Sequence, residues 1–250
     1  MLSNVSSFAV LVGIVLLRHE PMPHGRLLAW ALLGGCSGGV AITCFYLALS
    51  RGAMGASAAV SGLLAAAIPA AVSIGVEGAP STLRFVGFLL AAVAIWMIAA
   101  GPARQHAARS TVMLAVVAGI GFGVYFVALR MANPLGIFMP MAAARVGSLG
   151  VCGLAFLVLA SRGTRSATGG ASMNDRAMLW ALGAGALDTS GNLFFIAATR
   201  MGRLDVAAVL ASLYPASTIV LAGWLLHERL SRRQWLGMAV AVGAVAMISL

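Results

Sequence analysis

Charged residues are scarce in this chain, and one kind is missing altogether. Only 9% of the 250 residues are charged, and all 16 basic residues are arginine, with no lysine. A soluble domain carries about 25% charged residues, so too few remain here to cover a solvated surface. With 61% hydrophobic residues and a mean hydropathy of +1.00, the composition excludes an ordinary soluble protein. It predicts a polytopic membrane protein whose first partner is the lipid bilayer.

Cysteine and histidine are also scarce, and neither is grouped. Cys36, Cys44 and Cys152 all lie inside apolar runs without a Cys-x-x-Cys pair, which argues against metal binding and redox chemistry. The four histidines are widely separated in the segments between those runs. No Ser, His and Asp side chains combine into a catalytic arrangement, and no glycine-rich phosphate loop is present. The sequence therefore predicts neither a metal site nor an enzyme.

The net charge of +10 comes from arginines at the ends of apolar runs, where they stand singly or in small groups. Nucleic-acid binding would instead gather them on one face. Arginines at the ends of membrane segments are typical of loops that are anchored to lipid headgroups. We therefore expect no nucleic-acid partner.

Long apolar segments account for most of the chain, and an alternating barrel pattern is absent. Because lipid offers no partner for unpaired backbone groups, we expect these segments to be helices and the fold to be all-α. Nine such segments can be counted, at residues 2–17, 27–50, 53–76, 82–101, 112–132, 135–161, 177–199, 204–226 and 235–250.

The two halves of the chain resemble each other. Residues 44–60 align with residues 193–209 at a constant offset of 149, and Glu77 falls opposite Glu228 further on. This duplication predicts a first repeat over residues 1–101 with four helices and a second over residues 112–250 with five. The first repeat then lacks its opening helix. An odd number of spans inverts one repeat relative to the other, as in many transporters.

The second repeat carries a recognisable pattern: an aromatic-x-x-Ala-x-x-Arg segment, a proline inside the next apolar run, His-Glu-Arg-Leu and then Gln-x-x-Gly. The matching residues are Phe195, Ala198, Pro215, His227, Glu228, Arg229, Leu230, Gln234 and Gly237. This pattern resembles the EamA repeat of the drug/metabolite transporter superfamily, and the resemblance extends over nearly the whole chain. It implies two five-helix repeats, cytoplasmic termini, no cofactor and a place in a bacterial inner membrane.

The orientation in the membrane stays open. Six arginines fall on the side of the loop after the first segment and nine on the other. The positive-inside rule favours the second side as cytoplasmic, whereas the resemblance favours the first.

A few polar side chains lie inside apolar segments, where charges are costly and functional by default. Asp188 and Asn192 are four residues apart, so both face one side of a helix. We interpret them, with Arg145, as a polar patch that lines a substrate cavity, in which Arg145 and Asp188 pair with each other or contact a charged substrate. Alternatively, Arg145 reaches the headgroups and the other two form bonds between helices.

Three tyrosines are further candidates for a substrate cavity: Tyr46, Tyr125 and Tyr214. Aromatic side chains are common in ligand pockets, although simple packing also explains them. Pro69 and Pro215 each interrupt an apolar run and predict helix kinks.

The function that these features predict is secondary transport of a small organic solute, such as a metabolite, an amino acid or a drug. Two inverted repeats would alternate access to a central site. The alternative is a truncated, non-transporting membrane paralogue or a helper subunit. A homodimer is an arrangement that the sequence leaves open.

Overall fold

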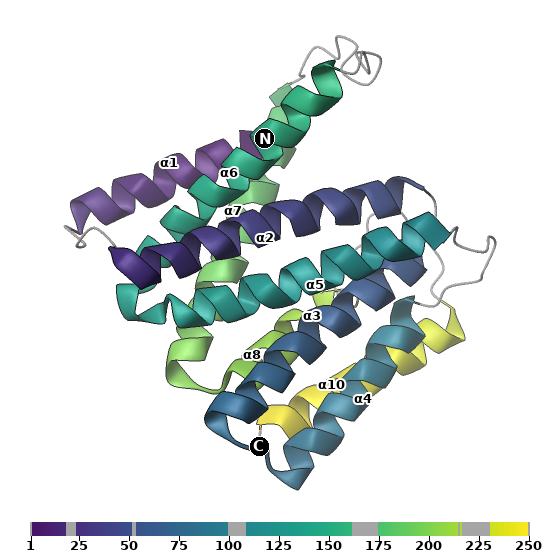
Figure 1. The fold of residues 1–250 in the computed structure, drawn as a ribbon. Coiled ribbons are helices and arrows are strands. Elements are labelled where there is room, and N and C mark those ends of the chain that lie inside the picture. The colour runs from purple at the N-terminus through teal and green to yellow at the C-terminus, as the bar shows by residue number, and fades with distance from the viewer. Residues whose placement is uncertain are drawn as a thin grey trace. The chain divides into compact units, whose positions relative to one another are not determined.

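The computed structural model describes residues 2–18, 24–51, 54–99, 109–161, 175–214, 216 and 231–249. Within these ranges the chain forms nine α-helices and one short 3-10 helix, and no strand (Figure 1). The helices are α1 (Leu2–Leu17), α2 (Gly25–Ser50), α3 (Met54–Glu77), α4 (Thr82–Ala99), α5 (Arg109–Met131), η1 (Asn133–Leu135), α6 (Phe138–Ser161), α7 (Asp175–Met201), α8 (Leu204–Ala211) and α10 (Arg232–Ser249).

Each of the nine predicted segments contains one of these α-helices, so the all-helical class is confirmed. Among the residues that the structure describes, four helices have a stretch long and apolar enough to cross a membrane: Gly25–Ser50, Ser57–Glu77, Arg109–Met131 and Phe138–Ala155. Val5–Leu17 and Thr82–Ile98 are also apolar but shorter. The chain is therefore a membrane protein with several apolar helices.

The helices pack into two compact units. Unit 1 consists of Met1–Val40 and Ala128–Arg200, and unit 2 of Ala41–Val127 and Met201–Leu250. Helices α2 and α5 contribute residues to both. Each unit therefore draws on segments from both halves of the sequence. The repeat boundaries at 1–101 and 112–250 describe duplication rather than packing, and they stay a prediction.

In unit 1, glycines allow α2 and α6 to approach closely. A Cβ atom added to Gly35 would overlap the backbone carbonyl of Ala144, and one added to Gly147 would lie 2.7 Å from the carbonyl oxygen of Leu32. Both obstacles are backbone atoms, which cannot turn aside as a side chain can. Close helix approach through small residues is the usual means of association in membranes, where apolar contact alone brings little gain.

In unit 2, α4 and α10 lie side by side and antiparallel (Figure 1). Their contact is reciprocal. A Cβ atom on Gly87 would lie 2.8 Å from Cγ1 of Ile248, and one on Gly237 would lie 2.8 Å from Cγ1 of Ile98. Positions 87 and 237, and positions 98 and 248, both differ by 150. Each helix therefore contacts the other through the same two positions: the glycine of one helix meets the isoleucine of the other.

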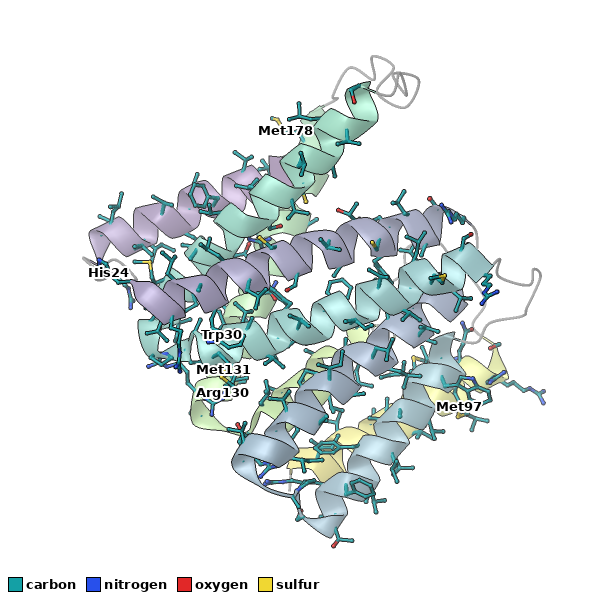
Figure 2. All side chains as sticks on the ribbon, viewed as in Figure 1. His24, Trp30, Met97, Arg130, Met131 and Met178 are labelled. Atoms are coloured by element: carbon teal, nitrogen blue, oxygen red, sulfur yellow. The ribbon has the colours of Figure 1, made fainter. Side chains whose placement is uncertain are left out.

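The same offset relates the neighbouring core residues. Ala91 clusters with Ala244 and Ile248, while Ala241 clusters with Ala94 and Ile98. Met97, the neighbour of Ile98, also borders this interface: its Cβ lies 3.0 Å from the Cβ position of Gly237 (Figure 2). The two helices present the same pattern of Gly, Ala, Ala and Ile to each other.

The starts of the two helices also correspond. The Ser81 hydroxyl accepts a hydrogen bond from the Arg84 N–H at 3.4 Å, and the Ser231 hydroxyl accepts one from the Gln234 N–H at 3.2 Å. Each serine caps free N–H groups at the start of its helix. The Gln234 side chain in turn accepts the Ser231 N–H at 2.8 Å, which closes a capping box.

Pro69 lies inside α3 and is fully buried. It removes one backbone donor from the helix interior, and its effect on the helix direction stays a prediction. Pro215 and the His227–Leu230 motif fall outside the described residues.

The glycine contact between α2 and α6 generates a test. We expect Gly35→Ala to lower the midpoint of thermal unfolding in detergent, because overpacking a tight contact costs about 1–3 kcal/mol. Gly150→Ala is the matched control, since Gly150 also lies on a helix of unit 1 but has open space at its Cβ position. The control should leave the midpoint unchanged or raise it. Equal effects of the two substitutions would contradict the packing described here.

Candidate functional site

The most polar place within the helices of unit 1 is built by α6 and α7. Arg145 lies in the middle of the apolar span of α6 and is 7% exposed. Its guanidinium forms an ion pair with Asp188 of α7 and donates a second hydrogen bond, of 3.1 Å, to the Thr189 hydroxyl. The structure thus pairs the two charged residues that the sequence singled out.

Asn192 completes this group one turn further along α7. Its side-chain amide donates to the Asp188 backbone carbonyl at 2.8 Å and to the Asp188 carboxylate at 3.2 Å. The four-residue spacing therefore does place both side chains on one face of the helix. We call Arg145, Asp188, Thr189 and Asn192 the polar cluster.

The two charges of the polar cluster differ in exposure. The Arg145 side chain is 8% exposed, whereas the Asp188 side chain is 52% exposed. The guanidinium is therefore enclosed by the helices, while about half of the carboxylate side chain is left uncovered by the described residues. An opposite charge compensates each group, so the cluster can be kept inside an apolar environment. A role of these residues in substrate binding stays a prediction.

The three candidate tyrosines lie in unit 2. Tyr214, at the end of α8, shares a 2.7 Å hydrogen bond with the Ser61 hydroxyl of α3. Tyr46 on α2 is 63% exposed and Tyr125 on α5 is partly buried. The structure therefore supports a polar contact for Tyr214 and leaves a substrate contact of all three as a prediction.

Two phenylalanines that the sequence analysis did not single out also lie here: Phe45 packs beside Tyr214, and Phe122 packs beside Phe45. The Phe45 ring lies 6.0 Å from the Tyr214 ring and 6.0 Å from the Phe122 ring, in both cases edge to face. Such pairs stabilise a packed arrangement beyond simple burial. Phe45 directly precedes Tyr46, so helical spacing points the two rings in different directions, and the sequence alone could not show which of them packs inward.

A third polar group lies at the junction of α3 and α8 in unit 2. Arg203 forms an ion pair with Asp205 at 2.9 Å, and the Asp205 side chain is completely buried. The hydrogen bonds to Asp205 raise the pKa of Arg203 above its ordinary value, although burial acts in the opposite direction. Glu77, the last residue of α3, accepts the Leu204 backbone N–H at 3.1 Å. The acidic residue in the first turn of α8 was the available signal for this group.

Trp30 and Arg130 both lie in unit 1 (Figure 2). Trp30 is partly buried and packs against the cluster of Ala31, Ala132 and Ala143, and Arg130 lies in the last turn of α5.

Comparison with known proteins adds a family and a fold. A model of the EamA-like transporter family matches residues 109–250, more than half of the chain. No curated protein matches the sequence. Among solved structures, one titled only "Crystal structure of protein" is similar over 100% of this chain and 86% of its own, with a TM-score of 0.79 and 16% identity. At that identity the likeness concerns the fold alone.

The pairing of Arg145 with Asp188 generates a second test. We expect Arg145→Met and Asp188→Asn each to lower the free energy of unfolding, and the double variant to lose less than the sum of the two. The coupling should be about 0.5–3 kcal/mol, as for residues in direct contact. Unfolding by SDS in mixed micelles measures all three values.

Ser190→Ala is the control, because Ser190 on the same helix bonds only to its own backbone, at Ala186. Its effect should add to that of Arg145→Met. Strict additivity of Arg145→Met and Asp188→Asn would show that the ion pair contributes nothing.

Proposed function

Because the chain belongs to the EamA-like transporter family, we propose that it is a secondary transporter that moves a small organic solute across a bacterial inner membrane. The solute is a metabolite, an amino acid or a drug. Transport proceeds by alternating access, in which two inverted repeats move about a site between the membrane faces. The family match favours this function over a non-transporting paralogue or helper subunit, and over an enzyme.

The polar cluster is the observation that carries the proposal. In a chain with so few charges, Arg145 and Asp188 lie within helices whose other side chains are mainly apolar. Replacing a buried ion pair by apolar residues is often neutral or stabilising. Stability alone therefore does not require an ion pair between α6 and α7, since apolar packing could join the two helices. The half-exposed carboxylate, with Asn192 beside it, supplies the polar contacts that hold a solute in passage.

The reciprocal contact of α4 and α10 supports the inverted repeats. When two related segments contact each other through the same residues, a two-fold axis relates them. Gly87 with Ile248 and Gly237 with Ile98 have this relation, and the helices run antiparallel. An axis of this kind lies in the membrane plane for inverted repeats. We propose nine spans, four in the first repeat and five in the second.

The aromatic residues of unit 2 are candidate solute contacts in their own right, separate from the polar cluster. These candidates are Tyr46, Tyr125 and Tyr214, of which Tyr214 is held by its hydrogen bond to Ser61. Kinks at Pro69 and Pro215 let the helices that carry them bend during the transport cycle.

Solute movement in proteoliposomes tests the function. The purified protein is reconstituted with a mixture of amino acids, organic acids and quaternary ammonium cations, and mass spectrometry follows their loss from the vesicles. We expect at least one solute class to leave these vesicles faster than it leaves vesicles that hold the same solutes but no protein. Asp188→Asn should slow this movement by about tenfold or more, because loss of one strong polar contact costs at least about 1.4 kcal/mol.

Ser190→Ala, which changes a neighbouring side chain of α7, should keep the wild-type rate. If all solutes leave at the rate measured for protein-free vesicles, the proposal of transport is contradicted. A wild-type rate for Asp188→Asn would remove Asp188 from the mechanism while leaving transport itself in place.

The inverted architecture has its own test, which needs no solute. Ser81 and Ser231 precede the corresponding helices α4 and α10, so inverted repeats put them on opposite sides of the membrane. In a background without native cysteines, we expect Ser81→Cys and Ser231→Cys to react with a membrane-impermeant maleimide from opposite sides. Reaction of both cysteines from the same side would rule out the inversion.

A further inference from the structure

The polar group at the junction of α3 and α8 is separate from the polar cluster and has a more elaborate network of bonds. It consists of Glu77 at the end of α3, Arg203 before α8 and Asp205 in the first turn of α8. We call these three residues the latch. They hold three of the charges of a chain that has only 22 acidic and basic residues.

Asp205 is the centre of the latch. Its carboxylate accepts hydrogen bonds from Nε of Arg203 at 3.1 Å and from Nη2 at 2.9 Å, and also from the Val206 backbone N–H at 2.8 Å. The side chain is 0% exposed. A buried carboxylate of this kind is tolerated only while its partner remains in place, and removing one partner of a buried pair is strongly destabilising.

Arg203 and Glu77 each cap the helix that the other belongs to. The guanidinium donates to the backbone carbonyls of Glu77 at 3.2 Å and Gly78 at 2.6 Å, at the end of α3. The Glu77 carboxylate accepts the Leu204 N–H at the start of α8 and the Ser73 hydroxyl at 2.7 Å. A cation thus meets a helix C-terminus and an anion meets a helix N-terminus, which is favourable in both cases.

Among the described residues, these bonds join the end of α3 to the start of α8. The two helices run antiparallel, since Glu77 contacts Leu204 while Ser61, farther back in α3, contacts Tyr214. The repeat offset of 149 assigns Met54 and Ala56, at the start of α3, to the positions of Arg203 and Asp205. Neither residue is charged, so the sequence has no counterpart of the Arg203–Asp205 pair at the start of α3, although Glu228 corresponds to Glu77.

We propose that the latch is a one-sided gate lock, which holds its end of the α3–α8 pair closed in the resting protein and leaves the opposite end as the one that opens readily. The inference rests on the proposed function, because alternating access requires each end to open in turn. If both ends of the α3–α8 pair had equivalent bonds, they would open equally often. Charge-assisted hydrogen bonds at the latched end shift the population toward the state in which that end is closed. Opening of the latched end requires the Arg203–Asp205 unit to leave the end of α3 while the ion pair itself stays intact.

Side-specific thiol labelling tests the lock without any solute. Ala208→Cys, on α8 one turn inside the latch, serves as the reporter in a background without native cysteines; Ala208 is 0% exposed. The membrane side of the latch is the side from which Ser81→Cys reacts. We expect Arg203→Gln and Asp205→Asn to raise reporter labelling by impermeant maleimide from that side by about tenfold or more, because hydrogen bonds to charged groups each shift an equilibrium by at least about this factor.

Arg84→Gln is the matched control, since it removes a guanidinium next to the same loop without touching the latch. It should leave labelling unchanged. Labelling that stays unchanged in Arg203→Gln and Asp205→Asn overturns the inference. So does a rise of equal size from both sides, which would indicate a general structural brace, or an equal rise in Arg84→Gln.

A second variant adds a lock instead of removing one and keeps the native latch intact. Met54→Arg with Ala56→Asp places the latch charges at the start of α3, and Ser57→Cys reports beside them. We expect labelling from the opposite membrane side to fall by about tenfold relative to Met54→Gln with Ala56→Asn, which is polar but uncharged. Equal labelling of the two variants overturns the role of charge asymmetry.

The outcomes for the lock and for transport are independent. A protein that moves none of the tested solutes still reports the lock through its labelling, and a protein without the lock still moves solute in proteoliposomes.

Discussion

The membrane interior has no water to bond with free backbone or charged groups, and this constraint governs the structure at every level. It requires each apolar segment to form its own backbone hydrogen bonds as a helix. It also requires the few internal charges to find partners within the protein. Arg145 with Asp188, and Arg203 with Asp205, are both such pairs, but their settings differ. One has a half-exposed carboxylate and the other a fully buried one. The roles proposed for them, solute binding for the first pair and closure for the second, follow this difference.

Close packing is the second requirement, because apolar helices gain little from contact with one another rather than with lipid. Gly35 and Gly147 bring α2 and α6 together, and Gly87 and Gly237 do the same for α4 and α10. The α3–α8 pair combines apolar packing, in which Ala66 lies against the cluster around Val209, with the polar bonds of the latch. The latched end is thus joined by polar bonds in addition to apolar packing.

Much of the fold was predictable from the sequence, since composition excluded a soluble protein and every apolar segment proved to contain a helix. The pairing of Arg145 with Asp188 was also open to prediction, because internal charges are so few. Phe45 and Phe122 could not be found in this way, since uniformly apolar helices do not reveal which face packs inward. Arg203 and Asp205 were missed because they lie next to a helix end, where charges are ordinarily solvated. Only the burial of Asp205 distinguishes them.

The reciprocal contact of α4 and α10 has a consequence for how the two halves of the gene can change. Duplicated segments usually drift apart once each copy has its own surroundings. Here each copy is the surroundings of the other, and Gly87 and Gly237 face the same kind of side chain in Ile248 and Ile98. A larger residue in either copy meets an obstacle supplied by its sibling. A larger residue on this face of either segment is therefore expected to be costly, whatever changes elsewhere in the two segments.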